Sequence, residues 1–194
     1  EVDSIRTFNI ESQRSIEKVE VVEIFPAKEV IVDEESKKRA NESIRKLNKA
    51  GIRVIVLTGD NADVTRCVCE KVGINSKNIV LGSQIEKLPD MGVTRLLKKT
   101  NVFAKLSPIQ KSRIVRILRQ NGNVVGYMGD GINDSPSLTN SDVGVSVDTA
   151  VDIAKESADI ILLEKDLNVL LDGVEERKTY ICKFNEIYKN GYKL

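Results

Sequence analysis

The stretch from Met128 to Pro136, MGDGINDSP, carries the strongest structural signal in the chain. It follows the apolar run VVGY, so an acidic loop with two glycines comes at the carboxyl end of an expected buried strand. Gly129 and Gly131 lack the Cβ atoms that would keep backbone N–H groups away from an anion, and Asp130 offers the hard oxygen that Mg²⁺ prefers. This order of residues favours a phosphate and metal site over a plain turn between a strand and a helix.

The rest of this motif adds polar groups and the start of a helix. Asn133 supplies an amide, and Asp134 supplies a second carboxylate. Pro136 suits the first turn of a helix, whose amino end would direct unpaired N–H groups to the same place. We therefore expect these groups to surround one bound anion.

A second loop with similar chemistry follows residues 53–57, RVIVL, which form an expected buried strand. Thr58, Gly59 and Asp60 come next, so a hydroxyl and a free backbone N–H meet at the end of this strand. An amphipathic helix is expected after the loop. Its predicted buried face consists of Val64, Cys67, Val68 and Val72.

A third loop follows the short expected strand 102–104. Ser107 and Pro108 form an N-cap and first-turn pair that opens the helix IQKSRIVRILRQ. Lys111 lies in the first turn of this helix, from which its ammonium group can reach a phosphate at the same sheet edge. A solvated helix lysine is the alternative interpretation, and the two other loops weigh against it.

Apolar runs alternate with amphipathic segments along the whole chain. This alternation predicts right-handed crossovers and an α/β, Rossmann-like fold, in which a largely parallel sheet carries helices on both faces. Ligands bind beyond the carboxyl ends of the strands in such sheets, where all three loops fall. The expected strands are 19–25, 52–57, 78–81, 101–104, 123–128, 143–147 and 159–163, and the expected helices lie near 36–50, 61–73, 91–99, 108–121, 149–157 and 166–188.

The motifs LTGDN, KLSPIQKSRIV and GYMGDGINDSP resemble, in order and spacing, the phosphorylation domain of P-type ion-pumping ATPases. These pumps belong to the haloacid-dehalogenase-like (HAD-like) superfamily. The resemblance runs from about Ile16 to the end of the chain, and the run SDVGVSVDTAVDIAKESADIILLEKDLNVL is most similar to bacterial magnesium-transporting ATPases. It implies a part of an enzyme that couples ATP hydrolysis to cation transport, with Mg²⁺ and ATP as cofactors.

The resemblance also implies a role for each residue of the motifs. Asp130 would be the direct Mg²⁺ ligand, and Asp134 would hold the loop in shape and support the water shell of the metal. Together with Lys111, which would neutralise the charge of the phosphoryl group, they form the expected catalytic set. The expected phosphate-binding residues are Thr58, Gly59, Asp60, Lys111 and Asn133.

The nucleophile of the family has no counterpart in this chain. P-type ATPases form an aspartyl phosphate on the aspartate of a DKTGT motif, and no Asp-Lys dipeptide occurs here. We therefore expect a fragment of a longer pump that is inactive alone, with an empty position in the middle of its sheet. Residues 1–15 would return from a missing nucleotide-binding domain, 16–175 would form the phosphorylation domain, and 176–194 would be a stalk helix leading toward a missing transmembrane helix.

The same resemblance implies the partners and the location of the parent pump. ATP would be bound through the missing domain, and missing helices would contact the membrane and the transported cation. This piece, itself soluble, would lie at the cytoplasmic face of the membrane. It has no run of about 18 apolar residues that could cross a bilayer. A net charge of +1 gives no general attraction to nucleic acid. The absence of histidine excludes acid–base catalysis by histidine and metal sites with histidine ligands.

Two other functions stay open. A soluble phosphatase of the same superfamily can also carry a lysine and a GDGxND loop, although the amino-terminal DxD motif that it needs is lacking. A non-catalytic module would bind Mg²⁺ and phosphate weakly. The coding sequence upstream of Glu1 would separate these alternatives.

Overall fold

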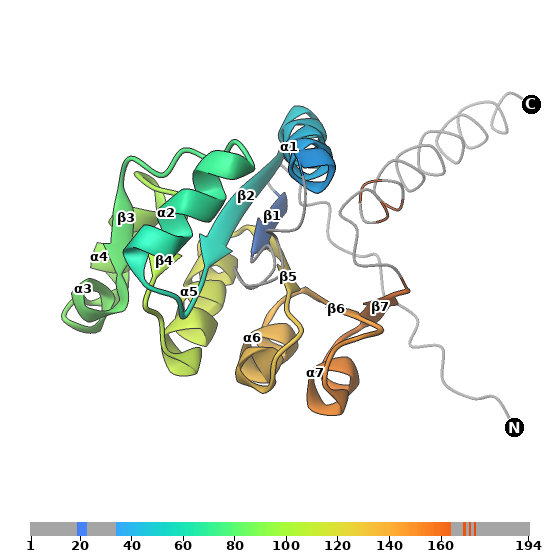
Figure 1. The fold of residues 1–194 in the computed structure, drawn as a ribbon. Helices are drawn as coiled ribbons and strands as arrows, with labels where there is room; N and C mark the ends of the chain where they lie inside the picture. Colours follow the sequence, from blue (N-terminus) through green and yellow to red (C-terminus); the bar gives the residue numbers. More distant parts are fainter. Residues whose placement is uncertain (1–18, 23–33, 164–168, 170, 172, 174–194) are drawn as a thin grey trace, which may run out of the picture.

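The computed structural model describes residues 19–22, 34–163, 169, 171 and 173. A seven-stranded sheet in the order β3-β4-β2-β1-β5-β6-β7 forms its centre (Figure 1). All pairings between these strands are parallel, so the predicted α/β fold is confirmed. The strands are β1 (Val19–Val22), β2 (Ile52–Leu57), β3 (Ile79–Leu81), β4 (Val102–Ala104), β5 (Val124–Met128), β6 (Val143–Val147) and β7 (Ile160–Leu162).

Helices cover both faces of this sheet. Figure 1 shows α1 and α2 on one side, and α5, α6 and α7 on the other. The helices are α1 (Glu34–Lys49), α2 (Ala62–Lys71), α3 (Gly82–Glu86), α4 (Asp90–Leu97), α5 (Pro108–Gln120), the 3₁₀ turn η1 (Ile132–Asp134), α6 (Ser135–Asn140) and α7 (Asp152–Glu156). The expected segments 1–15 and 176–194 lie outside the described residues, as does most of the expected helix 166–188.

Strand β1 lies in the middle of the sheet, where we expected an empty position. It pairs with β2 on one side and with β5 on the other, and Val22 lies opposite Ile55 and Tyr127. The expectation of a gap is therefore wrong. A gap would leave the facing edges of β2 and β5 with unpaired backbone groups inside the sheet, and the backbone of β1 pairs with both edges.

Helix α2 buries a different face from the one that the sequence predicted. Thr65, Cys69 and Val72 are buried, whereas Val64 and Cys67 are exposed. A buried threonine is tolerated because its hydroxyl donates to the backbone oxygen of Asn61 at 2.8 Å. Burial raises the pKa of the Cys69 thiol to about 11, and the charge of the neighbouring Glu70 acts in the same direction.

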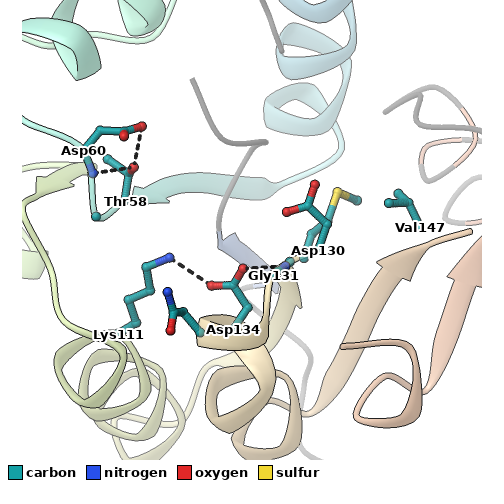
Figure 2. A pocket seen from close by; sticks show the side chains of 11 residues that line it. Thr58, Asp60, Lys111, Asp130, Gly131, Asp134 and Val147 are labelled. Carbon is teal, nitrogen blue, oxygen red and sulfur yellow. Dashed lines mark hydrogen bonds and ion pairs between the residues drawn. The ribbon is translucent and has the colours of Figure 1, made fainter. Parts of the chain in front are cut away.

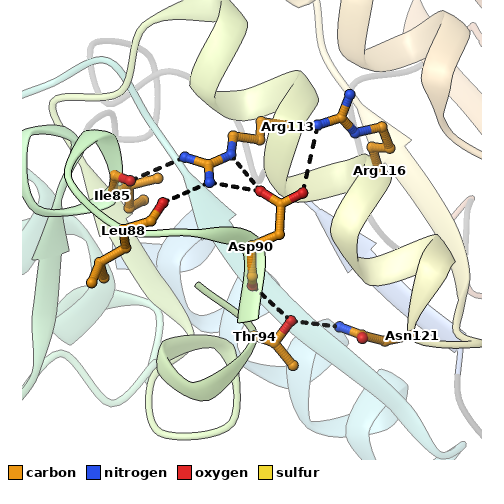
Figure 3. Close-up of polar contacts among 7 residues, drawn as sticks. All are labelled: Ile85, Leu88, Asp90, Thr94, Arg113, Arg116 and Asn121. Atoms are coloured by element: carbon orange, nitrogen blue, oxygen red, sulfur yellow. Dashed lines mark hydrogen bonds and ion pairs between the residues drawn. The ribbon is translucent and has the colours of Figure 1, made fainter. Parts of the chain in front are cut away.

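Helix α5, which carries Lys111, is fixed to its neighbours by Arg113 (Figure 3). The guanidinium donates twice to Oδ1 of Asp90, from Nε at 2.8 Å and from Nη2 at 2.6 Å. It also donates to the backbone oxygens of Ile85 and Leu88, at 3.1 Å and 2.7 Å. One planar side chain therefore joins α5 to α4 and to the end of α3.

Arg113→Lys should lower the free energy of unfolding by about 1–2 kcal/mol, because an ammonium group cannot reproduce this set of contacts. The loss stays moderate because the side chain of Asp90 is 48% exposed. Urea denaturation of the chain measures it. Arg116→Lys is the matched control, since Arg116 only approaches Asp90 at 3.8 Å from an exposed position, and it should change stability by less than about 0.5 kcal/mol. Equal losses in the two variants would contradict the role given to Arg113.

Candidate phosphate and metal site

A cavity of about 330 Å³ opens beyond the carboxyl ends of the central strands. Val22 of β1 lies opposite Ile55 of β2 and Tyr127 of β5. Thr58 and Asp130 each come three residues after these partners, so the loops after β2 and β5 begin at the same level of the sheet edge. The structure brings all the residues that the sequence singled out into this one lining. They are Thr58, Gly59, Asp60, Lys111, Asp130, Asn133 and Asp134.

The loop after β2 is held by a compact turn. The Thr58 hydroxyl donates to the Asp60 carboxylate at 3.2 Å and accepts from the Asp60 N–H at 3.1 Å. The backbone oxygen of Thr58 accepts from Leu106 N at 3.0 Å, which ties this loop to the loop after β4. Asp60 therefore orients the Thr58 hydroxyl at the rim of the cavity (Figure 2).

Helix α5 begins as the sequence predicted. Ser107 caps it by accepting from Gln110 N, and the Gln110 side chain accepts from Ser107 N, with Pro108 in the first turn. Lys111 follows, and it is 6% exposed. Figure 2 shows its side chain reaching from α5 toward Asp134. The capped helix end thus places one ammonium group in the wall of the cavity.

Asp134 accepts hydrogen bonds with both of its carboxylate oxygens. Its Oδ1 accepts from the Lys111 ammonium and from the Tyr127 hydroxyl, each at 2.9 Å. Its Oδ2 accepts from the backbone N–H of Gly131 at 3.2 Å. With 7% of the residue exposed, Asp134 is a buried carboxylate held by donors from α5, from β5 and from its own loop.

The role of Tyr127 could not be predicted from the sequence, because this residue lies in an apolar run. The structure also shows a second reason for the glycine at position 129. A Cβ built on Gly129 would come within 2.5 Å of the Cβ of Asp134, so the inward turn of Asp134 leaves room only for glycine. Glycine at position 129 is therefore required by the packing of Asp134 as well as by the access of an anion to the backbone.

The donor set of the cavity fits Mg²⁺ better than a transition metal. Within the described residues, no group of three or more histidine, cysteine or acidic side chains is arranged to hold a metal. Mg²⁺ commonly takes only one or two protein carboxylates and completes its shell with water and phosphate oxygens. Asp130 and Asp134 both line the cavity, so it offers the one or two carboxylates that such a site needs.

Comparison with known proteins supports this assignment of the fold. The family described as haloacid dehalogenase-like hydrolase matches residues 4–142. The chain belongs to the haloacid dehalogenase-like hydrolases. Its relatives include cation-transporting ATPases.

The chain is 51% identical over 145 residues to "Magnesium-transporting ATPase, P-type 1" of Salmonella typhimurium, covering 74% of this chain and 16% of that protein. It is 36% identical over 152 residues to "Calcium-transporting ATPase 1" of Bacillus cereus, covering 77% of this chain and 16% of that protein. The resemblance of this HAD-like chain to P-type ATPases is thus confirmed. The chain spans about a sixth of the length of these relatives.

Solved structures of P-type ATPases are also similar to this chain. The catalytic domain of the CPx-ATPase CopB-B matches with a TM-score of 0.52 and 31% identity, over 69% of this chain and 43% of that one. A zinc-transporting PIB-type ATPase in its E2.Pi state matches with a TM-score of 0.53 and 26% identity, over 70% of this chain and 18% of that one. No helix among the described residues is long and apolar enough to span a bilayer.

Proposed function

We propose that this chain is the carboxyl-terminal part of the phosphorylation domain of an ATP-driven cation pump, and that its cavity binds the aspartyl phosphate together with Mg²⁺. One observation carries the proposal. A hydroxyl from Thr58, an ammonium group from Lys111 and a carboxylate from Asp130 line one cavity at the carboxyl edge of a parallel sheet. These are the groups that phosphoryl transfer needs for positioning and for charge neutralisation.

Each residue has a separate task in this proposal. Lys111 and the Thr58 hydroxyl bind phosphoryl oxygens, assisted by the Gly59 backbone and the Asn133 amide. Asp130 binds Mg²⁺, which offsets the charge on the transferred group. Asp134 fixes the loop and orients water in the metal shell.

The nucleophilic aspartate would have to come from a strand that ends at this cavity. The loops that line it follow β2 and β5, and these two strands flank β1. In the whole pump, the nucleophile strand therefore takes the place that β1 holds here. The chain alone, without an aspartate at that place, should not form a phosphoenzyme.

The location, the nucleotide and the transported ion belong to the same proposal. The match to magnesium-transporting ATPases supports Mg²⁺ as the transported ion. The parent protein would be a membrane pump whose phosphorylation domain faces the cytoplasm, with ATP bound through another domain.

Titration of the ¹⁵N-labelled chain with MgCl₂ and inorganic phosphate tests the binding site. We expect amide shifts at Gly59, Gly129 and Gly131 that require both ions. Shifts elsewhere in the chain, or none at all, would exclude a phosphate site in this cavity.

The catalytic part is tested by incubating the chain with labelled ATP and Mg²⁺. No acid-stable, hydroxylamine-sensitive label should form, and p-nitrophenyl phosphate should not be hydrolysed. A label would show that a carboxylate of this chain acts as the nucleophile. Turnover of p-nitrophenyl phosphate would favour a soluble phosphatase over a piece of a pump.

A further inference from the structure

Tyr127 contributes a buried hydroxyl to the site from the core of the sheet. It is the second-last residue of β5 and is 0% exposed. Its hydroxyl donates to Oδ1 of Asp134 at 2.9 Å. An apolar ring would satisfy the packing of this strand equally well, so the hydroxyl needs an explanation of its own.

The same carboxylate oxygen also accepts from the Lys111 ammonium at 2.9 Å. The two donors differ in mobility. The lysine chain has four rotatable bonds, whereas the ring of Tyr127 is fixed by the surrounding core. Lys111 can therefore change partners while Tyr127 stays in place.

A phosphoryl group in the cavity would draw Lys111 away from Asp134, since both line the same space. A buried carboxylate that loses its donor is strongly destabilised. Tyr127 and the Gly131 N–H, which donates to Oδ2 at 3.2 Å, would then be the donors that keep Asp134 satisfied.

We propose that Tyr127 is a positioning residue that holds Asp134 in place while Lys111 turns to the phosphoryl group. This inference rests on the proposed function, because it requires a phosphoryl group in the cavity. Tyr127 acts here through Asp134 and Lys111, without touching the phosphate. The Tyr127 hydroxyl lowers the free-energy difference between two states, one in which Lys111 is paired with Asp134 and one in which Lys111 binds the phosphate.

The test compares phosphate binding by the wild-type chain and by Tyr127→Phe, measured by NMR titration with inorganic phosphate in the presence of MgCl₂. We expect Tyr127→Phe to weaken binding by about 10-fold, as removal of a supporting hydrogen bond typically does. Thr100→Val is the matched control. It removes another buried hydroxyl. Thr100 lies just before β4 and donates to the backbone oxygen of Asn78, just before β3, so this bond is at the amino ends of the strands and away from the cavity. It should lower stability and leave phosphate affinity within about 2-fold.

A double variant separates positioning from a general loss of structure. If Tyr127 acts by releasing Lys111, then Tyr127→Phe should have almost no further effect on phosphate affinity once Lys111→Met is present. Additive losses would assign the hydroxyl to structure alone and overturn the inference. Unchanged affinity in Tyr127→Phe would overturn it as well. Failure of the wild-type chain to bind phosphate at Gly59 and Gly131 would instead reject the proposed function itself.

Discussion

Lys111→Met is expected to lower the free energy of unfolding of the chain by about 3–5 kcal/mol. The side chains of Lys111 and Asp134 are only 7% and 9% exposed, and their charged atoms lie 2.9 Å apart. Methionine fills most of the space of the lysine stem, so the change removes charge more than volume. Asp134 is left as a buried carboxylate without its cation. Urea denaturation followed by circular dichroism measures the loss.

Two further variants show whether charge is the cause. Arg66→Met removes the cation of an exposed pair, in which the side chains of Arg66 and Asp63 are 48% and 94% exposed, and it should cost less than about 0.5 kcal/mol. Adding Asp134→Asn to Lys111→Met removes the uncompensated charge and should restore part of the stability. A double variant as unstable as the sum of both single variants would contradict a direct interaction.

The order of strands along the chain could be predicted because buried parallel strands appear as short apolar runs. The run VIVL in β2 is buried along its length, and Phe103 of β4 is 0% exposed. The start of α5 could also be predicted, because Ser107 and Pro108 act on the backbone of adjacent residues. Signals that depend on neighbouring residues alone were therefore reliable.

Other features depend on contacts between distant segments. The buried face of α2 is set by how the helix meets the sheet, which selected Thr65 and Cys69 over Val64. Helix α3 has only five residues, and its N-cap is Leu81, whose apolar side chain cannot cap a helix, so its sequence carried little helical signal. The central position of β1 depends on pairing with β2 and β5, which lie far along the chain.

The candidate site, too, could be predicted only in part from the sequence. Its residues could be named from three loops, because parallel strands bring their carboxyl ends to one edge. The arrangement inside the cavity could not. The bond from Tyr127 to Asp134 requires the loop to turn back over its own strand, and the contact from Lys111 requires α5 to pack beside it.

In the pump that we propose as the parent protein, Asp130→Asn should reduce phosphoenzyme formation from labelled ATP by about 100-fold or more. Three carboxylates line the cavity, and they are not equivalent. Asp60 accepts from the Thr58 hydroxyl, and Asp134 accepts with both oxygens from Lys111, Tyr127 and Gly131. Asp130 lies between Gly129 and Gly131 in this lining, and the proposed function gives this carboxylate the direct contact to Mg²⁺. An amide in its place keeps the shape of the loop but loses the charge.

Asp63→Asn is the control for that experiment, because the Asp63 side chain is 94% exposed on α2 and should not affect labelling. A circular dichroism melt of this chain with Asp130→Asn should match the wild type, since half-buried Asp130 lies at a loop and outside the core. Higher Mg²⁺ should restore part of the labelling if the amide oxygen still binds the metal weakly. Normal labelling of the Asp130 variant at low Mg²⁺ would show that another group holds the metal, and the role given to this loop would then be wrong.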